Sequence, residues 1–299
     1  MPARSRFRLF KFPVKNQLHR FTRSKFGSFL FFAILISGGL FSVLPLVYCI
    51  TTSFKPLDEL LIFPPTLFTV KRPTIANYTA IPDLLSGLSV PITRYAFNSI
   101  FVSIIGTFLS VIISAMAAFV LSKTEMKFNR LIFTVVQFSL LFNAYTLSVP
   151  QYIVYSKIGI INTYLAYIVP AAASSMGVFL MKQYMDGYVP YALIEAAHID
   201  GAGWIGIFTR IVLPIVRPCV LTLVMFSFLG IWNSVPSGTI FSESLKTLPT
   251  VMSTIAAGGL ARSGSSMATS VILMIFPIAV YLISQGSIKE TMGSAGIKG

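Results

Sequence analysis

The sequence predicts an all-α integral membrane protein with six transmembrane helices. Hydrophobic residues make up 55% of the 299 residues and charged residues only 11%, whereas a soluble domain carries about 25% charged residues. The mean hydropathy is +0.80. The charges leave six long uncharged stretches, at residues 26–54, 95–122, 131–156, 158–181, 218–242 and 263–288. Because about 20 apolar residues cross a bilayer, each stretch is long enough for one span.

Two other fold classes fit this pattern less well. In lipid, every backbone N–H and C=O must be bonded internally, which leaves helices or a closed barrel. The uncharged stretches are too long and too continuously apolar for barrel strands. A large soluble core would have to bury all of these stretches as helices, which is far less common.

The placement of Lys and Arg predicts the orientation of the spans. Residues 1–25 contain several Lys and Arg and no acidic residue, and cytoplasmic flanks carry the excess of basic residues. We therefore expect 1–25 to be a basic cytoplasmic N-terminal segment and 26–299 to be a single membrane domain. With six spans, both termini are cytoplasmic, in a bacterial inner or plasma membrane. The first apolar run exceeds the roughly 7–15 residues of a signal-peptide core, so we expect an uncleaved helix.

The formal net charge of +14 mainly reflects the Lys and Arg residues that this topology places on the cytoplasmic side. Nucleic-acid binding calls for a basic patch on a soluble domain, so we expect no nucleic-acid partner. Contact with anionic membrane lipid is expected for the basic segment. On the opposite side, residues 52–95 are rich in proline, which predicts irregular structure outside the membrane.

A polar segment at 182–217 lies between the fourth and fifth uncharged stretches. Pro190 suits the first turn of a helix, where its missing N–H costs nothing. We expect a short helix over 191–198, ended by Gly201 in the left-handed conformation. The segment thus predicts a cytoplasmic hairpin at about 187–214, lying at the membrane surface.

The second half of this 187–214 hairpin has its own signals. Asp200 is expected to cap a second helix over 204–212, and Pro214 is expected to stop it. Small side chains around the turn would let another protein approach closely. From the residues alone, a docking surface and a plain connecting loop are about equally good interpretations.

Several classes of enzyme are excluded by missing motifs. The chain has no G-x-x-x-x-G-K-[ST] sequence, the phosphate cradle of nucleotide hydrolases. His198 has no neighbouring Cys or His with which to hold a metal. We therefore expect no catalytic residue and no metal site in this chain.

The hairpin carries Glu195-Ala196-Ala197, Gly201 and Ile211-Val212-Leu213-Pro214. These residues resemble the EAA motif of permease subunits of binding-protein-dependent ABC importers, which reads E-A-A, three variable positions, Gly, then I-x-L-P. The residues Asp200-Gly201-Ala202 resemble the sequence that is common at this place in the sugar-importing branch of the family.

Further matches along the chain resemble the six-span subunit of the maltose type. In order, they are Ser53-Phe54-Lys55-Pro56, Asn98-Ser99, Gly159-Ile160-Ile161-Asn162-Thr163, Phe179-Leu180-Met181-Lys182-Gln183-Tyr184, Trp232-Asn233 and Gly296-Ile297-Lys298-Gly299. Ala192, Ser234 and Cys219 depart from residues common in the family, which leaves details of subunit pairing open.

This resemblance implies a set of partners and a coupling site. The partners are a second permease subunit forming a heterodimer, two ATP-binding subunits and an extracellular solute-binding protein. The hairpin would rest on one ATPase subunit, and ATP and Mg would be used there, with no cofactor bound by this chain. The implied coupling residues are Glu195, Ala196, Ala197, Asp200, Gly201 and Ala202.

The sequence says less about the transported solute than about the class of transporter. The spans contain no charged residue, which fits a neutral sugar or oligosaccharide better than a charged solute. Amide and aromatic side chains suit sugars, and the candidates for the path are Gln137, Asn143, Tyr145, Gln151, Trp232 and Asn233. Packing between helices is an equally good interpretation of these six residues. An importer of a non-sugar solute, a secondary transporter or channel, and a membrane scaffold remain alternatives.

Overall fold

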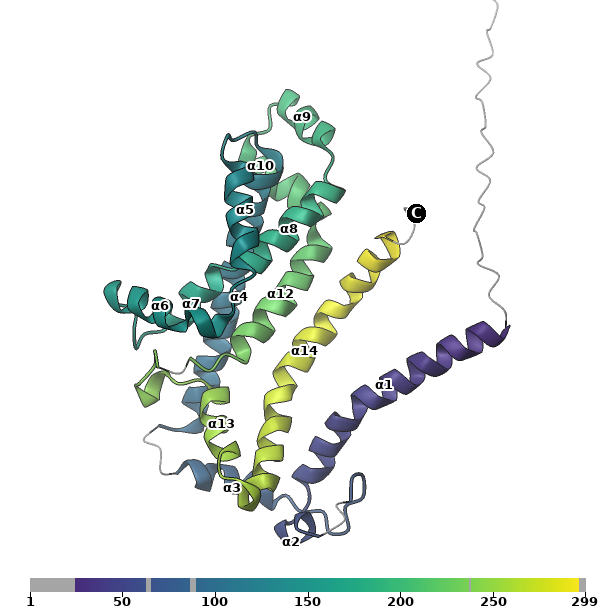
Figure 1. The fold of residues 1–299 in the computed structure, drawn as a ribbon, viewed down its shortest axis with the longest axis vertical. Coiled ribbons are helices and arrows are strands. Elements are labelled where there is room, and N and C mark those ends of the chain that lie inside the picture. Colours follow the sequence, from purple (N-terminus) through teal and green to yellow (C-terminus); the bar gives the residue numbers. More distant parts are fainter. Residues whose placement is uncertain (1–24, 63–65, 87–89, 237, 296–299) are drawn as a thin grey trace, which may run out of the picture. The chain divides into compact units, whose positions relative to one another are not determined.

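The computed structural model describes residues 25–62, 66–86, 90–236 and 238–295, and these contain helices and no β-strand. In chain order they form α1 (Lys25–Ser53), α2 (Leu57–Leu60), α3 (Ala76–Leu85), α4 (Ile92–Lys123), α5 (Asn129–Ser139), α6 (Ala144–Lys157), α7 (Leu165–Ala172), α8 (Ser175–Tyr188), α9 (Tyr191–Ile199), α10 (Trp204–Ile207), η1 (Phe208–Val212), α11 (Leu213–Ile215), α12 (Arg217–Trp232), η2 (Glu243–Leu245), α13 (Leu248–Ala256), η3 (Leu260–Arg262) and α14 (Ser263–Ala295). The predicted all-α class is therefore confirmed (Figure 1). The basic segment up to residue 24 and the terminal motif at 296–299 lie outside the described residues.

The chain divides into two compact units, residues 1–47 and 48–299. In the first unit, the described part is the larger portion of α1. The second unit holds all the other helices and every contact discussed below. Because each unit is defined by its own contacts, the two are described separately.

Four helical stretches are long and apolar enough to cross a membrane. They are Phe26–Ser53, Ile92–Lys123, Leu165–Tyr188 and Ser263–Gln285. A fifth candidate is the pair Trp204–Ile215 and Arg217–Trp232, which is bent by 81°. The described part of the chain is thus that of an integral membrane protein, with four or five candidate spans where the sequence predicts six.

The difference lies mainly in the predicted third span, 131–156, which is not one helix in the structure. It is divided into α5 and α6 by residues 140–143. The carbonyl of Asn143 accepts the first backbone bonds of α6, from Thr146 N at 3.1 Å and Leu147 N at 3.3 Å. Asn is among the residues favoured at the start of a helix, so a new helix begins here inside an uncharged run. A scan for charge alone does not detect such a break.

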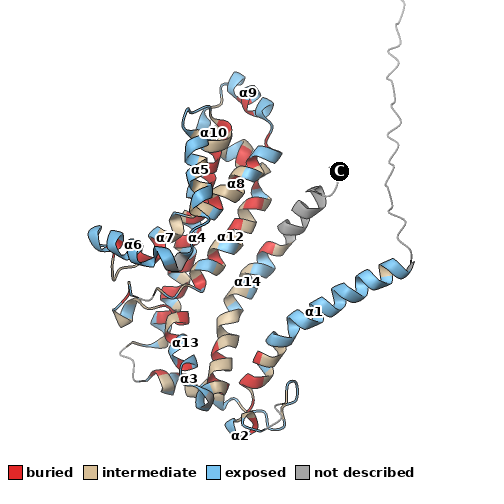
Figure 2. Ribbon diagram, in the orientation of Figure 1, coloured by how far each residue is buried: buried red, intermediate tan, exposed pale blue. Residues whose placement is uncertain are grey.

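Helix α4 is the centre of the second unit and packs against α7, α8 and α12. Its buried face is lined by small residues, namely Ser99, Ser103, Gly106, Ser110, Ser114 and Ala118. Small side chains let helices approach closely in membranes and bond across the contact. Buried residues gather on these packed helices in Figure 2. The close packing of α4 sets the geometry of both sites described below.

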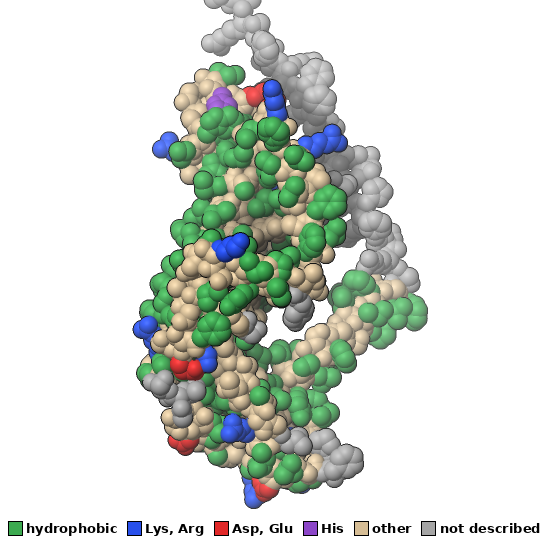
Figure 3. All heavy atoms as spheres, turned by 60° about the vertical axis from the view of Figure 1, so that its left-hand side comes forward, with side chains coloured by type: hydrophobic (Ala, Val, Ile, Leu, Met, Phe, Trp, Pro, Cys, Tyr) green, Lys and Arg blue, Asp and Glu red, His purple; other side chains and the backbone are tan. Residues whose placement is uncertain are grey.

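The segments of the second unit that were predicted to lie on opposite sides of the membrane are at opposite ends. Helices α9 and α10 lie at one end, and α2, α3 and α13 lie at the other (Figure 1). On the face shown in Figure 3, hydrophobic side chains cover the middle of this unit and most charged side chains lie toward its two ends. This separation of charge is what a bilayer-spanning body requires.

The proline-rich loop after α1 contains little helix, as predicted, and specific hydrogen bonds hold it in place. The buried carboxylate of Glu59 accepts hydrogen bonds from the backbone N–H groups of Lys71 and Arg72, at 3.0 and 3.4 Å. Asn77 Nδ2 donates to the carbonyls of Ser53 and Lys55, at 2.9 and 2.7 Å. The Ser53-Phe54-Lys55-Pro56 motif is therefore an anchor for this loop.

Candidate functional site

The 187–214 hairpin has the local structure that its sequence predicts in its first half. Helix α9 begins after Pro190, and Gly201 follows it with φ of +80°. Gly201 N donates to His198 O at 3.0 Å, and Ala202 N donates to Ala197 O at 2.9 Å. This is the pair of bonds that closes a helix with a left-handed glycine. The turn is consequently rigid, with its polar groups bonded internally.

Two local predictions for the second half are wrong. Helix α10 begins after Gly203, with no side-chain cap, because the turn ends too late for Asp200 to reach that position. Asp200 instead ends α9. Pro214 does not stop the helix, since it occupies the first turn of α11, where proline is tolerated. The chain turns at Val216 instead, by the 81° bend that leads into α12.

The side of the hairpin that packs against α4 and α8 is buried and apolar, and it forms what we call the apolar seat. Ile194, Ala197, Ile207 and Val212 are buried in one cluster with residues of α4 and α8. Phe119 of α4 is part of this cluster and packs edge-on against Trp204, with ring centroids 6.0 Å apart. These contacts fix the hairpin on the helices beneath it.

The upper surface of the hairpin is exposed and carries apolar side chains. Ile199 and Ile205 are 87% and 81% exposed. Trp204, half exposed, contacts His198 across the turn with ring centroids 4.4 Å apart. Exposed apolar side chains of this size around a small-residue turn are typical of a surface that another protein covers.

The structure places the six predicted coupling residues on this hairpin. Glu195, Ala196, Asp200 and Gly201 are exposed, Ala202 is half-buried, and Ala197 is buried on the underside. Ala197 therefore supports the seat, and the others border the upper surface.

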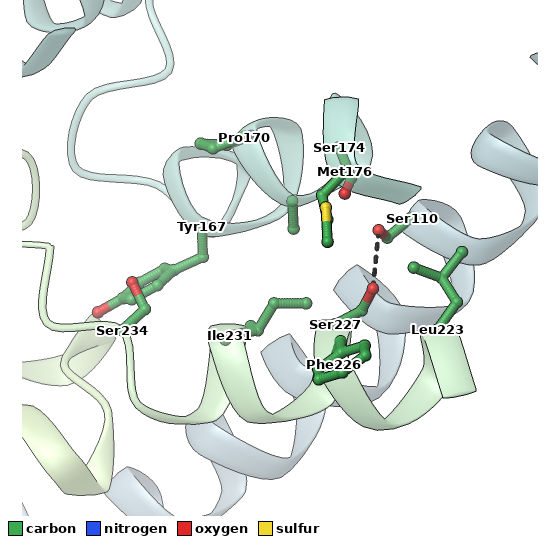
Figure 4. Close-up of a pocket in the computed structure, with 12 residues that line it drawn as sticks. Ser110, Tyr167, Pro170, Ser174, Met176, Leu223, Phe226, Ser227, Ile231 and Ser234 are labelled. Atoms are coloured by element: carbon green, nitrogen blue, oxygen red, sulfur yellow. Dashed lines mark hydrogen bonds between the residues drawn. The ribbon is translucent and has the colours of Figure 1, made fainter. Parts of the chain in front are cut away.

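A second feature is a cavity of about 380 Å³ between α4, α7, α8 and α12. Its polar lining consists of Ser110, Tyr167, Ser174, Ser227 and Ser234, and its apolar lining includes Pro170, Met176, Leu223, Phe226 and Ile231. Figure 4 shows Ser110 and Ser227 pointing toward each other, joined by a hydrogen bond of 3.1 Å between their Oγ atoms. A cavity lined by hydroxyls and aromatic rings, with no charge, has the chemistry to hold a neutral polyhydroxylated solute.

The five residues predicted for the path whose side chains are described do not line this cavity. Gln137 and Gln151 are exposed on α5 and α6, Asn143 lies between those helices, and the side chain of Tyr145 lies outside the described residues. Trp232 is buried and donates from Nε1 to Leu273 O of α14 at 3.2 Å, and Asn233 is exposed at the end of α12. The structure brings Trp232 into helix packing, and the role of the six residues in the path stays a prediction.

The sequence prediction for the path was based on amides and aromatic rings and therefore did not include the serines of this cavity. A signal for part of the set is in the sequence: Ser99, Ser103, Ser110 and Ser114 are spaced by four, seven and four residues. That spacing puts four hydroxyls on one face of a helix. All four are buried, and Ser110 reaches the cavity.

Two motifs that carried the family resemblance tie together the end of the unit opposite the hairpin. Asn98 is fully buried, donates to Ser244 O and Lys246 O at 2.8 and 2.9 Å, and accepts from the Tyr164 hydroxyl at 2.8 Å. Asn162 has φ of +58°, and its Oδ1 accepts from the backbone N–H groups of Phe241 and Ser242. Asn98 holds the segment after α12 against α4, and Asn162 holds the same segment against the loop before α7.

Comparisons with known proteins agree with this architecture. The chain is 28% identical over 277 residues to the sulfoquinovosyl glycerol transport system permease protein of Agrobacterium fabrum, covering 91% of this chain and 93% of that protein. The crystal structure of a bacterial ABC transporter that imports the acidic polysaccharide alginate matches with a TM-score of 0.70 at 18% identity, over 88% of this chain and 98% of that one. The alginate transporter bound to its alginate-loaded periplasmic protein matches with a TM-score of 0.55 at 15% identity, over 86% and 93%. No protein-family model matches the chain.

The fold and the sequence similarity define the same class of protein. Over most of its length the chain is similar to permease proteins of bacterial transport systems, one of them an ABC transporter, and it has the fold of a chain from a bacterial ABC transporter. More particularly, its resemblance to the permeases of carbohydrate importers, stated above from short motifs, is confirmed over most of its length.

Proposed function

We propose that this chain forms half of the path by which an ATP-driven importer carries a sugar or oligosaccharide across the membrane. Relatives that cover most of the chain are permeases of carbohydrate systems. The observation that carries the proposal is the hairpin, with a rigid turn at Gly201, a buried apolar seat and an exposed apolar upper surface.

In this proposal, the hairpin is the cytoplasmic coupling element that rests on an ATP-binding subunit. The chain binds no cofactor, and ATP and Mg are bound and used by the two ATPase subunits. When ATP closes those subunits, the docked hairpin moves with them and shifts the permease between inward-facing and outward-facing states. A ligand shifts such an equilibrium only by its different affinity for the two states.

The proposed topology keeps six spans, with the hairpin between the fourth and fifth and both termini in the cytoplasm. A second permease completes the heterodimer and supplies the other half of the path, and an extracellular binding protein delivers the cargo. The opposite placement of the hairpin and of the α2, α3 and α13 segments supports this arrangement. The broken 131–156 stretch would then cross as two helical pieces, α5 and α6.

The cavity is our candidate for the part of the path that this chain contributes. It has hydroxyl donors and acceptors and the rings of Tyr167 and Phe226, which match the two kinds of contact that sugars use. The six residues predicted from the sequence stay a separate prediction for the path, since the five with described side chains do not line the cavity.

The test is purification of the tagged chain from native membranes in mild detergent, followed by reconstitution in liposomes with the co-purifying proteins. We expect a second permease and ATP-binding subunits in the complex, and ATP-dependent uptake of a neutral sugar. The docking surface is tested with Ile205→Asp, and the matched control is Phe241→Asp, an exposed apolar residue in the segment after α12. Ile205→Asp should release the ATPase subunits and Phe241→Asp should not; equal retention by both variants contradicts docking at the hairpin.

The same experiment separates the alternative functions. Uptake of an amino acid or ion in place of a sugar would make the chain a permease for a non-sugar solute. Recovery of the folded chain alone, with uptake that needs no ATP, would favour a secondary transporter or channel.

A further inference from the structure

Lys123 is the last residue of α4, and its side chain is buried beside the start of the hairpin. The residue is 4% exposed, and its Nζ donates to the carbonyl of Val189 at 2.7 Å. Val189 ends α8, and Pro190, which has no N–H, follows it. The last carbonyls of a helix lack partners within the helix, and a lysine ammonium supplies one here.

A second hydrogen bond runs between the same two segments in the opposite direction. The hydroxyl of Tyr191, the first residue of α9, donates to the carbonyl of Lys123 at 3.2 Å. The ammonium of Lys123 lies 5.9 Å from the centroid of the Tyr191 ring, within reach of a cation–π interaction. Among the described ion pairs, none includes Lys123, and its charged neighbours are Asp186 and Lys182 of α8.

The neighbouring residue strengthens the same junction. Ser122 Oγ donates to Asp186 Oδ1 of α8, and Lys182 binds the other oxygen of that carboxylate at 2.6 Å. The end of α4 is thus bonded both to α8 and to the entry of the hairpin. A buried cation is tolerated only where its hydrogen bonds are satisfied, so a lysine at this position has a specific contact to make.

The order of the helices along the chain explains why hydrogen bonds between α4 and the hairpin matter. The hairpin is covalently continuous with α8 at one side and, through η1 and α11, with α12 at the other. Helix α4 is joined to it only by non-covalent contacts. Yet α4 carries Ser110 on the cavity wall, 13 residues before Lys123, or about 20 Å away along a helix.

We propose that Lys123 is a positioning residue that fastens α4 to the hairpin, so that movement of the hairpin is passed to the wall of the cavity that α4 forms. This inference rests on the proposed function, because it assigns a role within ATP-driven coupling. Without the two reciprocal bonds, α8 and α12 would still follow the hairpin, while α4 would contact the hairpin itself through apolar packing and would reach it otherwise only through its bonds to α8 and α12.

The test uses the whole complex, reconstituted in liposomes, and compares Lys123→Met with Lys127→Met. Methionine keeps the length and packing of the side chain and removes the donor. Lys127 is exposed and lies four residues further on, so its substitution removes the same charge on the same side of the membrane. The measured quantity is cargo taken up per ATP hydrolysed.

We expect Lys123→Met to lower this ratio about tenfold, within the range of coupling between two sites, while ATPase activity and subunit assembly persist. Lys127→Met should keep the ratio of the unmodified complex. If Lys123→Met does not assemble, Tyr191→Phe, which loses only one hydroxyl, takes its place and should lower the ratio in the same direction. An unchanged ratio in the assembled variant overturns the role of Lys123.

Failure of the proposed function has a different signature. An unmodified complex that shows no ATP-dependent uptake would overturn the importer itself. An unmodified complex that transports, beside a Lys123→Met complex that transports equally well per ATP, would overturn only the positioning role.

Discussion

Ser110 of α4 and Ser227 of α12 hydrogen-bond to each other through their Oγ atoms, at 3.1 Å, on the wall of the cavity. Helix α12 follows the hairpin directly along the chain, whereas α4 contacts the hairpin only through non-covalent interactions. The bond joins these two helices. A relative shift of the two helices would therefore break or remake a polar contact on the cavity wall, and a hydroxyl of the proposed solute could replace either serine as partner.

Filling the cavity is the most direct way to test its use. Ser227→Leu places a larger side chain in the lining, and we expect uptake to fall by roughly tenfold or more, since the lost contacts exceed 1.4 kcal/mol. Ser227→Ala is the matched control, because it removes the same hydroxyl without filling the space, and it should cost no more than about fivefold for one neutral hydrogen bond. Uptake kinetics in liposomes distinguish the two variants. Equal effects would mean that the cavity is not on the path.

The turn of the hairpin depends on the backbone conformation of Gly201. Its φ is +80°, and a Cβ there would meet nothing within 4 Å, so strain is the reason that a substitution is costly. We expect Gly201→Val to cost about 1–3 kcal/mol locally and to abolish uptake in an assembled complex. Gly203→Val is the control, since Gly203 is equally open but has φ of −75°. Normal uptake by Gly201→Val would contradict the role of the turn.

Close contact between α4 and α8 predicts a difference between two glycines of α8. A Cβ on Gly177 would overlap Ser114 Oγ and lie 3.1 Å from Ser114 Cβ, whereas a Cβ on Gly187 would meet nothing within 4 Å. We expect Gly177→Ala to destabilise the fold by about 1–3 kcal/mol through overpacking. Gly187→Ala should leave the melting temperature unchanged or slightly raised, because alanine favours helix. Thermal unfolding of the purified complex measures both, and equal melting temperatures would refute the tight contact.

Asn98 is expected to be the main polar anchor at the end opposite the hairpin. Its side chain makes three buried hydrogen bonds. At about 1 kcal/mol each, Asn98→Ala should lower the free energy of unfolding by roughly 3 kcal/mol. Asn233→Ala, at an exposed position, serves as the control and should change stability by less than about 0.5 kcal/mol. If chemical unfolding finds the two variants alike, the anchor is weaker than its geometry indicates.

The features that the sequence predicted correctly are those set by local chemistry. Gly201 ends α9 because only glycine enters that conformation freely, and the lack of charge identified long helices such as α4 and α14.

The features that were missed depend on tertiary contacts or on signals other than charge. The break at residues 140–143 lies within an uncharged run, and a new helix begins directly after Asn143. The cavity depends on where four helices separate, which no pattern within one helix specifies. Trp232 packs between α12 and α14, where its N–H donates to the carbonyl of Leu273, and its place on the path stays a prediction.

The row of small residues on α4 has a consequence for how this sequence can diverge among its descendants. Ser103, Gly106, Ser110 and Ser114 are in contact with neighbouring helices, so inherited changes there should be confined to residues of similar size. Ile104 and Phe108, on the exposed face of the same helix, are free to exchange among apolar residues. In an alignment of orthologues, the positions on the packed face of α4 should therefore vary little and those on its exposed face should vary freely. The two kinds of position should alternate with the helical period.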